Sequence, residues 1–331
     1  MSTKLSIGIV GLPNVGKSTL FNALTKKSVP AENYPFCTID PSVGIVPVPD
    51  DRLYKLSELS KSKKTIPAVV EFVDIAGLVE GASKGEGLGN KFLTNIREVD
   101  AVLHMVRTFE DPSVIHVNNK VDPIRDVGVI NLELVLADFE TVSKRIANLN
   151  KDVKRGDKEA IKEEDILKKV EKVLEEGKMA TEANLHEEEK FQIKSLNLLT
   201  LKPMLYALNT SEANENVDVN IPGMYVKIDP VFEKGFDELI KKSYELLGLE
   251  TFFTTGEDET RAWTIKKGST APLAGSAIHN DFKDKFIRAE AISTEKLLEA
   301  GSYAKAKEKG WLRTEGKEYI VEDGDVIEFL V

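Results

Sequence analysis

The chain has 331 residues, of which 41% are hydrophobic, and its formal net charge is −10. This length exceeds what one hydrophobic core usually organises, so we expect two or three domains. The single cysteine, Cys37, excludes an intrachain disulfide and fits a reducing compartment. No run of about 18 or more apolar residues is present and the N-terminus lacks a signal-peptide pattern, so we expect a cytoplasmic protein without a membrane span. The acidic balance disfavours nucleic-acid binding through bulk charge; we expect no sequence-specific DNA contact, and any RNA contact must use a local basic face.

The first expected elements are a strand, a glycine-rich loop and a helix. An apolar run at residues 5–10 leads into Gly11-Leu-Pro-Asn-Val-Gly16-Lys17-Ser18, which matches the phosphate-binding pattern G-x-x-x-x-G-K-[ST]. Small residues let backbone N–H groups surround phosphate oxygens, and the Lys17 ammonium adds positive charge. The Ser18 hydroxyl is a hard oxygen ligand for Mg²⁺. A helix that follows directly, over residues 19–27, adds the positive potential of its N-terminus.

A second apolar strand, at residues 68–73, ends in Asp74-Ile-Ala-Gly77. A carboxylate at the end of a buried strand after a phosphate loop is a typical Mg²⁺ partner, and the Gly77 N–H can reach a γ-phosphate. Between the two motifs lies Thr38, where a threonine can complete the Mg²⁺ shell when a γ-phosphate is present. We therefore predict that Ser18, Thr38 and Asp74 bind the metal. The residues predicted to bind phosphate are Asn14, Val15, Gly16, Lys17, Ser18, Thr19 and Gly77.

The residue after Gly77 bears on the chemistry. A Ras-like GTPase places a water-orienting glutamine there, whereas this chain has Leu78, which cannot polarise water. Catalysis therefore needs another side chain, a cation or a partner. Asn14 occupies a loop position where some related hydrolases use asparagine to hold K⁺, so we predict a K⁺ site beside the phosphates.

Two segments compete as the purine-reading loop. Asn119-Lys-Val-Asp122 matches the guanine-reading pattern N-K-x-D. That loop should follow the strand after next, with a crossover helix between them. Between the strand at residues 101–106 and the apolar segment that leads into Asn119 there are only seven residues, 107–113, and they include a proline. Seven residues are too few for a crossover helix, so the match is interpreted as a coincidence.

The better candidate follows a later strand, residues 202–208, which ends in Asn209-Thr210-Ser211-Glu212. Asn209 can hydrogen-bond a purine N7, but the lysine and aspartate of the guanine-reading pattern are missing. We predict a base site made by Asn209, Thr210 and Glu212 that accepts adenine. Two alternatives stay open: a GTPase that reads guanine through Asn119–Asp122, and a nucleotide-gated binding module whose hydrolysis is incidental.

A helical insertion is expected between the strand at residues 101–106 and the strand at residues 202–208. Apolar residues recur at alternating steps of three and four, a heptad pattern that predicts an antiparallel coiled-coil arm. A break at Gly156-Asp157 separates the two helices, and a third helix is expected at residues 187–199. The residues of the pattern are Leu132, Val135, Phe139, Val142, Ile146, Leu149 and Val153 in the first helix, and Leu167, Val170 and Leu174 in the second.

The last 80 or so residues have the pattern of a small mixed β domain with one or two helices. Residues 262–275 predict a hairpin followed by the start of a helix. Residues 318–331 read as strand, Asp-Gly turn and strand, which predicts a second hairpin.

Taken together, these segments resemble the YchF family, whose eukaryotic members are called Obg-like ATPases. The C-terminal part of the match resembles a TGS domain, a ubiquitin-like β-grasp module. The resemblance implies a preference for ATP, a coiled-coil arm inserted in the nucleotide-binding domain, association with ribosomes, and His116 as the substitute for the missing glutamine. The resembling segments are Gly11–Ser18, Asn33–Thr38, Asp74–Asn90, Asn209–Glu212, Arg261–Trp263, His279–Phe282 and Val321–Asp325.

The expected fold class is α/β: a Ras-like P-loop domain, an inserted antiparallel coiled coil and a C-terminal TGS domain. We predict the P-loop ATPase domain at 1–130 and 200–247, the insertion at 131–199 and the TGS domain at 248–331. The expected function is that of a monomeric Mg²⁺-dependent ATP hydrolase that binds ATP, and GTP less selectively, and acts as a nucleotide-controlled switch of a ribosome-binding surface.

Overall fold

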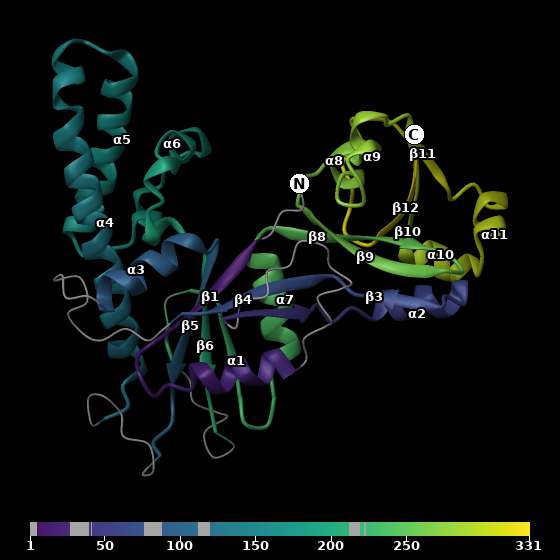
Figure 1. The fold of residues 1–331 in the computed structure, drawn as a ribbon, viewed down its shortest axis with the longest axis horizontal. Helices are drawn as coiled ribbons and strands as arrows, with labels where there is room; N and C mark the ends of the chain where they lie inside the picture. Colours follow the sequence, from purple (N-terminus) through teal and green to yellow (C-terminus); the bar gives the residue numbers. More distant parts are fainter. Residues whose placement is uncertain are drawn as a thin grey trace. The chain divides into compact units, whose positions relative to one another are not determined.

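The computed structural model describes residues 5–26, 40, 42–75, 88–111, 120–211, 219–221 and 223–331. The chain forms two compact units, each assembled from segments that are distant in sequence (Figure 1). One unit comprises Met1–Ser6, Leu24–Phe72 and Phe236–Val331; the other comprises Ile7–Ala23 and Val73–Gly235. None of the helices that the structure describes is both long enough and apolar enough to cross a bilayer.

The second unit is built on a parallel sheet. Four strands are neighbours in the order β1 (Ser6–Val10), β5 (Ala101–Arg107), β6 (Met204–Asn209) and β7 (Tyr225–Ile228), and each adjacent pair is parallel. All seven residues of β5 are buried, as an apolar run in the middle of a sheet requires. The end of β4 (Val69–Asp74) lies beside β1: the N–H of Ile75, the residue after β4, donates to Ile9 O at 3.3 Å. The predicted strands are confirmed.

Helices join these strands. The phosphate loop leads into α1 (Lys17–Lys26), which begins two residues earlier than expected, and α3 (Leu88–Glu98) precedes β5. Because the strands are parallel, their carboxyl ends meet at one edge of the sheet, where loops of an α/β fold usually bind ligands.

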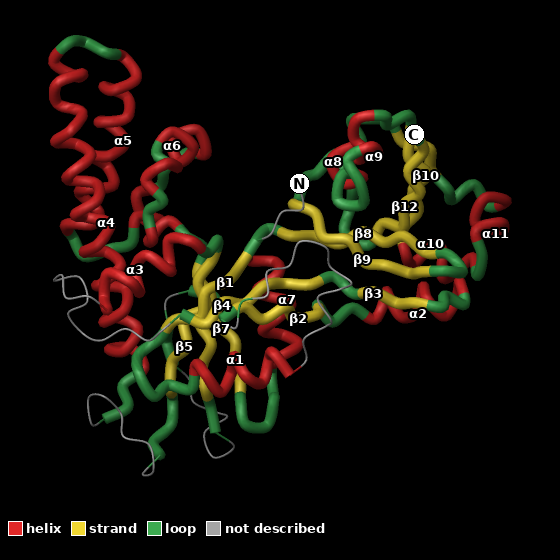
Figure 2. Tube along the Cα trace, viewed as in Figure 1, coloured by secondary structure: helices red, strands yellow, loops and turns green. Residues whose placement is uncertain are grey.

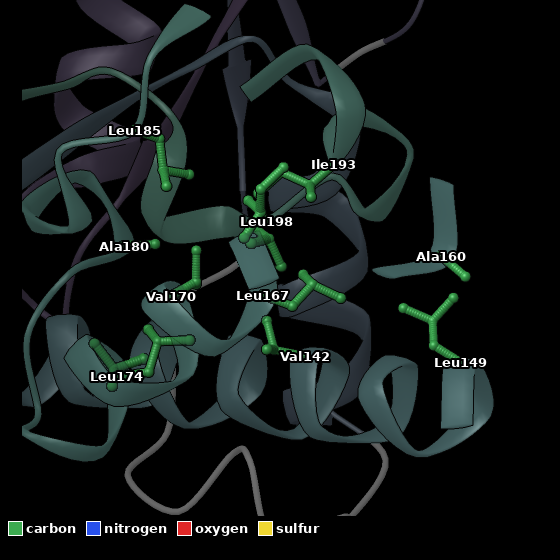
Figure 3. Close-up of a cluster of buried hydrophobic side chains, with 12 residues drawn as sticks. Val142, Leu149, Ala160, Leu167, Val170, Leu174, Ala180, Leu185, Ile193 and Leu198 are labelled. Carbon is green, nitrogen blue, oxygen red and sulfur yellow. The ribbon is translucent and has the colours of Figure 1, made fainter. Parts of the chain in front are cut away.

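A pair of long helices connects β5 to β6. Helix α4 (Pro123–Lys154) and helix α5 (Lys158–Glu175) run side by side as a hairpin (Figure 2), with the break at Gly156 (φ +81°) and Asp157 as predicted. A buried cluster lines the seam between them (Figure 3). Leu132 is the exception to the predicted pattern, since 51% of it is exposed. The residues of the seam are Val135, Val142 and Leu149 from α4 and Leu167, Val170 and Leu174 from α5.

The third helix expected at residues 187–199 is wrong beyond Gln192. Helix α6 (Glu187–Gln192) is followed by short 3₁₀ turns, η4 (Lys194–Leu196) and η5 (Leu199–Leu201); another, η3 (Ala180–Ala183), precedes it. Asn197 takes a left-handed conformation (φ +48°), which ends helical geometry. The buried Asp138 carboxylate then accepts the N–H groups of Leu199 and Thr200, at 2.9 and 2.7 Å. In a continuing helix these N–H groups would instead donate to helix carbonyls.

The first unit contains a mixed sheet in the order β11-β10-β12-β8-β9-β3. Its edge strand β3 comes from early in the chain and pairs in parallel with β9. The strands are β3 (Lys64–Ile66), β8 (Leu249–Thr255), β9 (Glu259–Lys266), β10 (Arg288–Ser293), β11 (Arg313–Glu315) and β12 (Asp325–Leu330), with β2 (Val43–Pro47) in the same unit. The helices are α2 (Asp51–Ser60), α7 (Phe236–Leu246), α8 (Ala271–Gly275), α9 (Asp281–Asp284), α10 (Thr294–Ala300) and α11 (Tyr303–Glu308).

Both hairpins expected in the C-terminal region are wrong in their partners. Strand β9 forms its antiparallel pair with the preceding β8, and the chain after it turns into α8. Residues 318–321 and β12 do not pair with each other: Ile320 bridges Thr270, whereas β12 pairs with β10 and β8. The cause lies in the turn, where the Asp325 carboxylate accepts the Tyr319 hydroxyl and the Glu322 N–H and redirects the chain.

The helical hairpin generates a stability prediction. Leu167→Ala removes a fully buried side chain from the seam and should lower the local free energy of unfolding by about 2–5 kcal/mol. Leu132→Ala is the matched control, since the same truncation at an exposed position should change it by less than about 0.5 kcal/mol. Native-state hydrogen exchange of the α4 and α5 amides measures both. Equal effects of the two substitutions would contradict the packing described here.

Candidate nucleotide-binding site

The phosphate loop is shaped by backbone conformations that its glycines allow. Gly11 (φ +154°) and Gly16 (φ +100°) both have positive φ, and Asn14 (φ +63°) is left-handed. A Cβ on Gly11 would lie 2.5 Å from Met105 O, and one on Gly16 would lie 2.7 Å from the side-chain nitrogen of Asn209. Both glycines are therefore required by close approach as well as by conformation.

The Lys17 ammonium is held inside the loop. Only 9% of the residue is exposed, and Nζ donates to Gly11 O at 3.0 Å and Leu12 O at 2.8 Å. Burial lowers the pKa of Lys17 to about 8, and the nearby Asp74 carboxylate partly opposes this. Burial likewise raises the pKa of Asp74, against the attraction of Lys17. Lys17, at the start of α1, and Asp74, at the end of β4, are thus electrostatic neighbours.

The described histidine nearest to Lys17 in this site, His104, adds no positive charge. His104 lies on β5 with its ring centroid 5.4 Å from that of Tyr206. Burial, with a further contribution from Lys17, lowers the pKa of His104 to about 3. The imidazole therefore stays neutral, and Lys17 supplies the charge.

Asn209 joins the end of β6 to the phosphate loop. Its side-chain N–H donates to Val15 O at 2.8 Å, across 194 residues of sequence. Its own carbonyl accepts from the N–H and the hydroxyl of Thr108, at 3.1 and 2.9 Å. A primary amide carries two N–H groups, so one remains for a purine N7. Because adenine and guanine both present N7, this contact recognises a purine without choosing between them.

A cavity of about 670 Å³ opens beside this loop, a size suited to a small-molecule ligand. The structure brings most of the described candidate residues together there, namely Asn14, Val15, Gly16, Lys17, Ser18, Thr19, Asn209 and Thr210. The other lining residues were not among the predicted site residues; they are Arg107, Phe109, Asp111, Ser211, Asp229, Pro230, Val231 and Phe232. Most follow the carboxyl ends of β5 and β7, so the strand order, had it been known, would have been the signal that locates them.

The two missed loops are internally braced. Arg107 Nε donates to Phe109 O at 2.9 Å, and its guanidinium lies 5.0 Å from the centre of the Phe109 ring. In the other loop, one carboxylate oxygen of Asp229 accepts the N–H groups of Val231 and Phe232, at 2.9 and 3.1 Å. These bonds hold both loops in defined positions at the cavity wall.

Several predicted residues lie outside the described residues: Thr38, Gly77, Leu78, His116, Asn119 and Glu212. Of the competing guanine-reading motif, Asp122 is described. It caps the start of α4, where its side chain accepts the Arg125 N–H at 3.1 Å. Asp122 is not among the residues that line the cavity. Strand β5 lies between β1 and β6, and β6 ends at Asn209. Both observations favour Asn209 as the base-site residue.

The fold agrees with the similarity of the chain to known proteins. Residues 6–210 match the family described as "50S ribosome-binding GTPase". The chain is 52% identical to "Ribosome-binding ATPase YchF" of Bacillus subtilis (strain 168), over 98% of each chain. The chain belongs to the YchF family. A relative of the same name in Escherichia coli O157:H7 is 47% identical, again over 98% of each chain.

A solved structure and the C-terminal region support the same assignment to the YchF family. The solved "Structure of the Schizosaccharomyces pombe YchF GTPase" has a TM-score of 0.88 at 38% identity, covering 100% of this chain and 98% of that one. Residues 249–331 match a YchF-associated C-terminal family described as "Protein of unknown function (DUF933)". The chain therefore has the α/β P-loop GTPase fold.

The lowered pKa of Lys17 predicts how nucleotide affinity depends on pH. A bound triphosphate brings negative charge to Nζ and raises its pKa above about 8, so binding at higher pH takes up a proton. This contribution to affinity is complete below pH 8 and is lost as pH rises through it, by up to about tenfold per pH unit. Fluorescent-nucleotide titration, with calorimetry in two buffers of different ionisation enthalpy, measures both effects.

Lys17→Arg is the control for this pH dependence. A guanidinium keeps its charge, so residual nucleotide binding by this variant should not vary between pH 8 and about 9.5. Unchanged affinity of the unmodified protein over the same range would show that Lys17 does not titrate there.

Proposed function

We propose that this chain is a Mg²⁺-dependent ATP hydrolase that acts as a nucleotide-controlled switch and associates with ribosomes. The observation that carries the proposal is the phosphate loop held between Lys17 and Asn209 at the mouth of the cavity. The relatives named "Ribosome-binding ATPase YchF", at 47–52% identity, support ATP as the nucleotide and the ribosome as the partner. We further propose that the protein is monomeric and cytoplasmic.

The residues near the phosphates fit a magnesium ion. Ser18 lines the cavity at the start of α1, and the Asp74 carboxylate ends β4 close to Lys17. Hydroxyl and carboxylate oxygens are the ligands that Mg²⁺ prefers, and Thr38 is proposed to join them. When bound, the ion neutralises charge on the β- and γ-phosphates. Lys17 binds the outer phosphate oxygens, and the N–H groups of Asn14–Gly16 and Gly77 orient them.

Water activation is assigned to residues other than Leu78. His116 is proposed to accept a hydrogen bond from the attacking water, because a neutral imidazole can do so near neutral pH. Asn14 is proposed to hold K⁺ beside the phosphates, where the cation stabilises charge that develops in the transition state. Its left-handed conformation in the loop supports a special position for this side chain.

The domain organisation is proposed as predicted. The P-loop ATPase domain comprises 1–130 and 200–247, and the helical insertion at 131–199 is an antiparallel coiled coil. The alternation of buried Val135, Val142 and Leu149 with partly buried Phe139, Ile146 and Val153 supports the coiled coil. Residues 248–331 form a TGS domain, and their sheet with helices packed against it supports a β-grasp architecture.

Nucleotide binding and hydrolysis test the proposal directly. The purified protein should bind Mg²⁺-ATP at least as tightly as GTP and hydrolyse it. Lys17→Ala should abolish tight binding, because it removes the charge facing the outer phosphates. Ser18→Ala should weaken binding in Mg²⁺ more than in EDTA. GTP binding tenfold tighter than ATP binding, about 1.4 kcal/mol, would overturn the ATP assignment.

The proposed role of His116 has its own kinetic signature. His116→Ala should lower kcat by about tenfold or more and leave the ATP Kd nearly unchanged, because the side chain acts on water and not on the nucleotide. Replacing K⁺ with Na⁺ at equal ionic strength should lower kcat if Asn14 holds the cation. A normal turnover of His116→Ala per folded molecule would assign His116 to packing instead.

A further inference from the structure

The base site offers a way to distinguish adenine from guanine at a single atom. Along the purine edge that carries N7, adenine presents an N6 amino donor at the next position, whereas guanine presents the O6 acceptor. If Asn209 donates to N7, the group beside Asn209 faces position 6. An acceptor there fits adenine, and a donor there fits guanine.

The register of the sheet shows which group that is. Strands β6 and β7 pair in parallel with Asn209 beside Ile228, and the Thr210 N–H donates to Ile228 O at 2.8 Å. Asp229 directly follows β7, one residue beyond the partner of Asn209, and neighbouring strands lie about 4.8 Å apart. It also lines the same cavity.

The backbone N–H groups of the loop after β7, residues 229–232, already donate hydrogen bonds within the protein. The N–H groups of Val231 and Phe232 both donate to one carboxylate oxygen of Asp229, and Pro230 has no N–H. The N–H of Asp229 itself donates to Lys234 O at 3.1 Å. Residues 229–232 therefore have no uncommitted backbone N–H to offer a guanine O6.

The same loop retains an acceptor. Within the described part of the chain, both hydrogen bonds to the Asp229 carboxylate use its Oδ1 atom, which leaves Oδ2 to accept from another donor. Only 7% of the residue is exposed, so the carboxylate is held in place. An amino group at position 6 can donate to Oδ2, whereas a carbonyl oxygen there would meet a second acceptor and be repelled.

We propose that Asp229 selects adenine over guanine at position 6 of the purine. Its Oδ1 accepts hydrogen bonds from the N–H groups of Val231 and Phe232, and its Oδ2 accepts one from the adenine amino group. This inference rests on the proposed function, because it takes the cavity to be the nucleoside triphosphate site. It assigns the adenine preference to the residue that follows β7, in addition to the missing aspartate of the guanine-reading motif.

Asp229→Asn tests the assignment with little change in shape. The amide oxygen can still accept the Val231 and Phe232 N–H groups, while Oδ2 is replaced by an N–H donor. We expect the ratio of ITP to ATP affinity to rise by about tenfold or more, because inosine differs from adenosine at position 6 without adding a 2-amino group. The ratio of GTP to ATP affinity should rise in parallel.

Asp157→Asn is the matched control. Asp157 also accepts two backbone N–H groups with one carboxylate oxygen, at 2.9 and 3.0 Å, but it lies in the turn between α4 and α5. This variant loses the same charge and should leave all nucleotide ratios unchanged. Thermal melting of both variants shows whether the fold is retained.

The unmodified protein gives a second test that does not depend on a variant folding. Purine riboside triphosphate, which lacks any group at position 6, should bind about tenfold more weakly than ATP. Equal binding of ATP, ITP and purine riboside triphosphate, or unaltered ratios in a folded Asp229→Asn, would overturn this inference and leave the proposed function standing. Failure to bind any triphosphate with Mg²⁺ would overturn both.

Discussion

The parallel pairing of β5 with β6 is the constraint on which the nucleotide site depends. The chain leaves β5 at Arg107, builds the helical hairpin and returns so that Val102 to Arg107 pair in register with Met204 to Asn209. A shift of one residue would turn the Asn209 side chain to the opposite face of the sheet and remove its bond to Val15 O. The Asp138 carboxylate accepts the N–H and the hydroxyl of Thr200, which anchors the returning segment just before β6 begins.

Desolvation gives the phosphate loop its affinity for charge. Two backbone carbonyls accept the Lys17 ammonium, but they replace the hydration of a cation only in part, which is why its pKa falls to about 8. A triphosphate is a stronger acceptor than a carbonyl, so a bound phosphate offsets the desolvation free energy of the Lys17 ammonium. The Asp74 carboxylate shares this environment, and Mg²⁺ at Ser18 and Asp74 would relieve its desolvation in the same way.

Local sequence patterns predicted the elements that local physics controls. The phosphate loop and its strand follow from glycine spacing and an apolar run, and both were confirmed. The heptad steps also pointed to six residues of the buried cluster between α4 and α5. The C-terminal strand partners were not predictable, because pairing Ile320 with Thr270 depends on contacts 50 residues apart. The loop from Asp229 to Phe232 was missed for a similar reason: it contributes to the cavity only because β7 lies beside β6.

The C-terminal sheet also depends on a distant segment. Strand β3 covers the edge of β9, with Lys64, Thr65 and Ile66 beside Glu259, Thr260 and Arg261. The preceding helix α2 is also bonded to this region, since the Thr255 hydroxyl of β8 donates to Ser60 Oγ at 2.8 Å and Arg52 bonds Asp323 at 2.8 Å. A fragment cut at residue 248 would therefore expose an edge strand that is paired in the whole chain, and exposed edges invite aggregation. Because only Pro67 and Ala68 separate β3 from β4, the same short stretch of chain supplies a strand to this sheet and then runs to the Asp74 carboxylate.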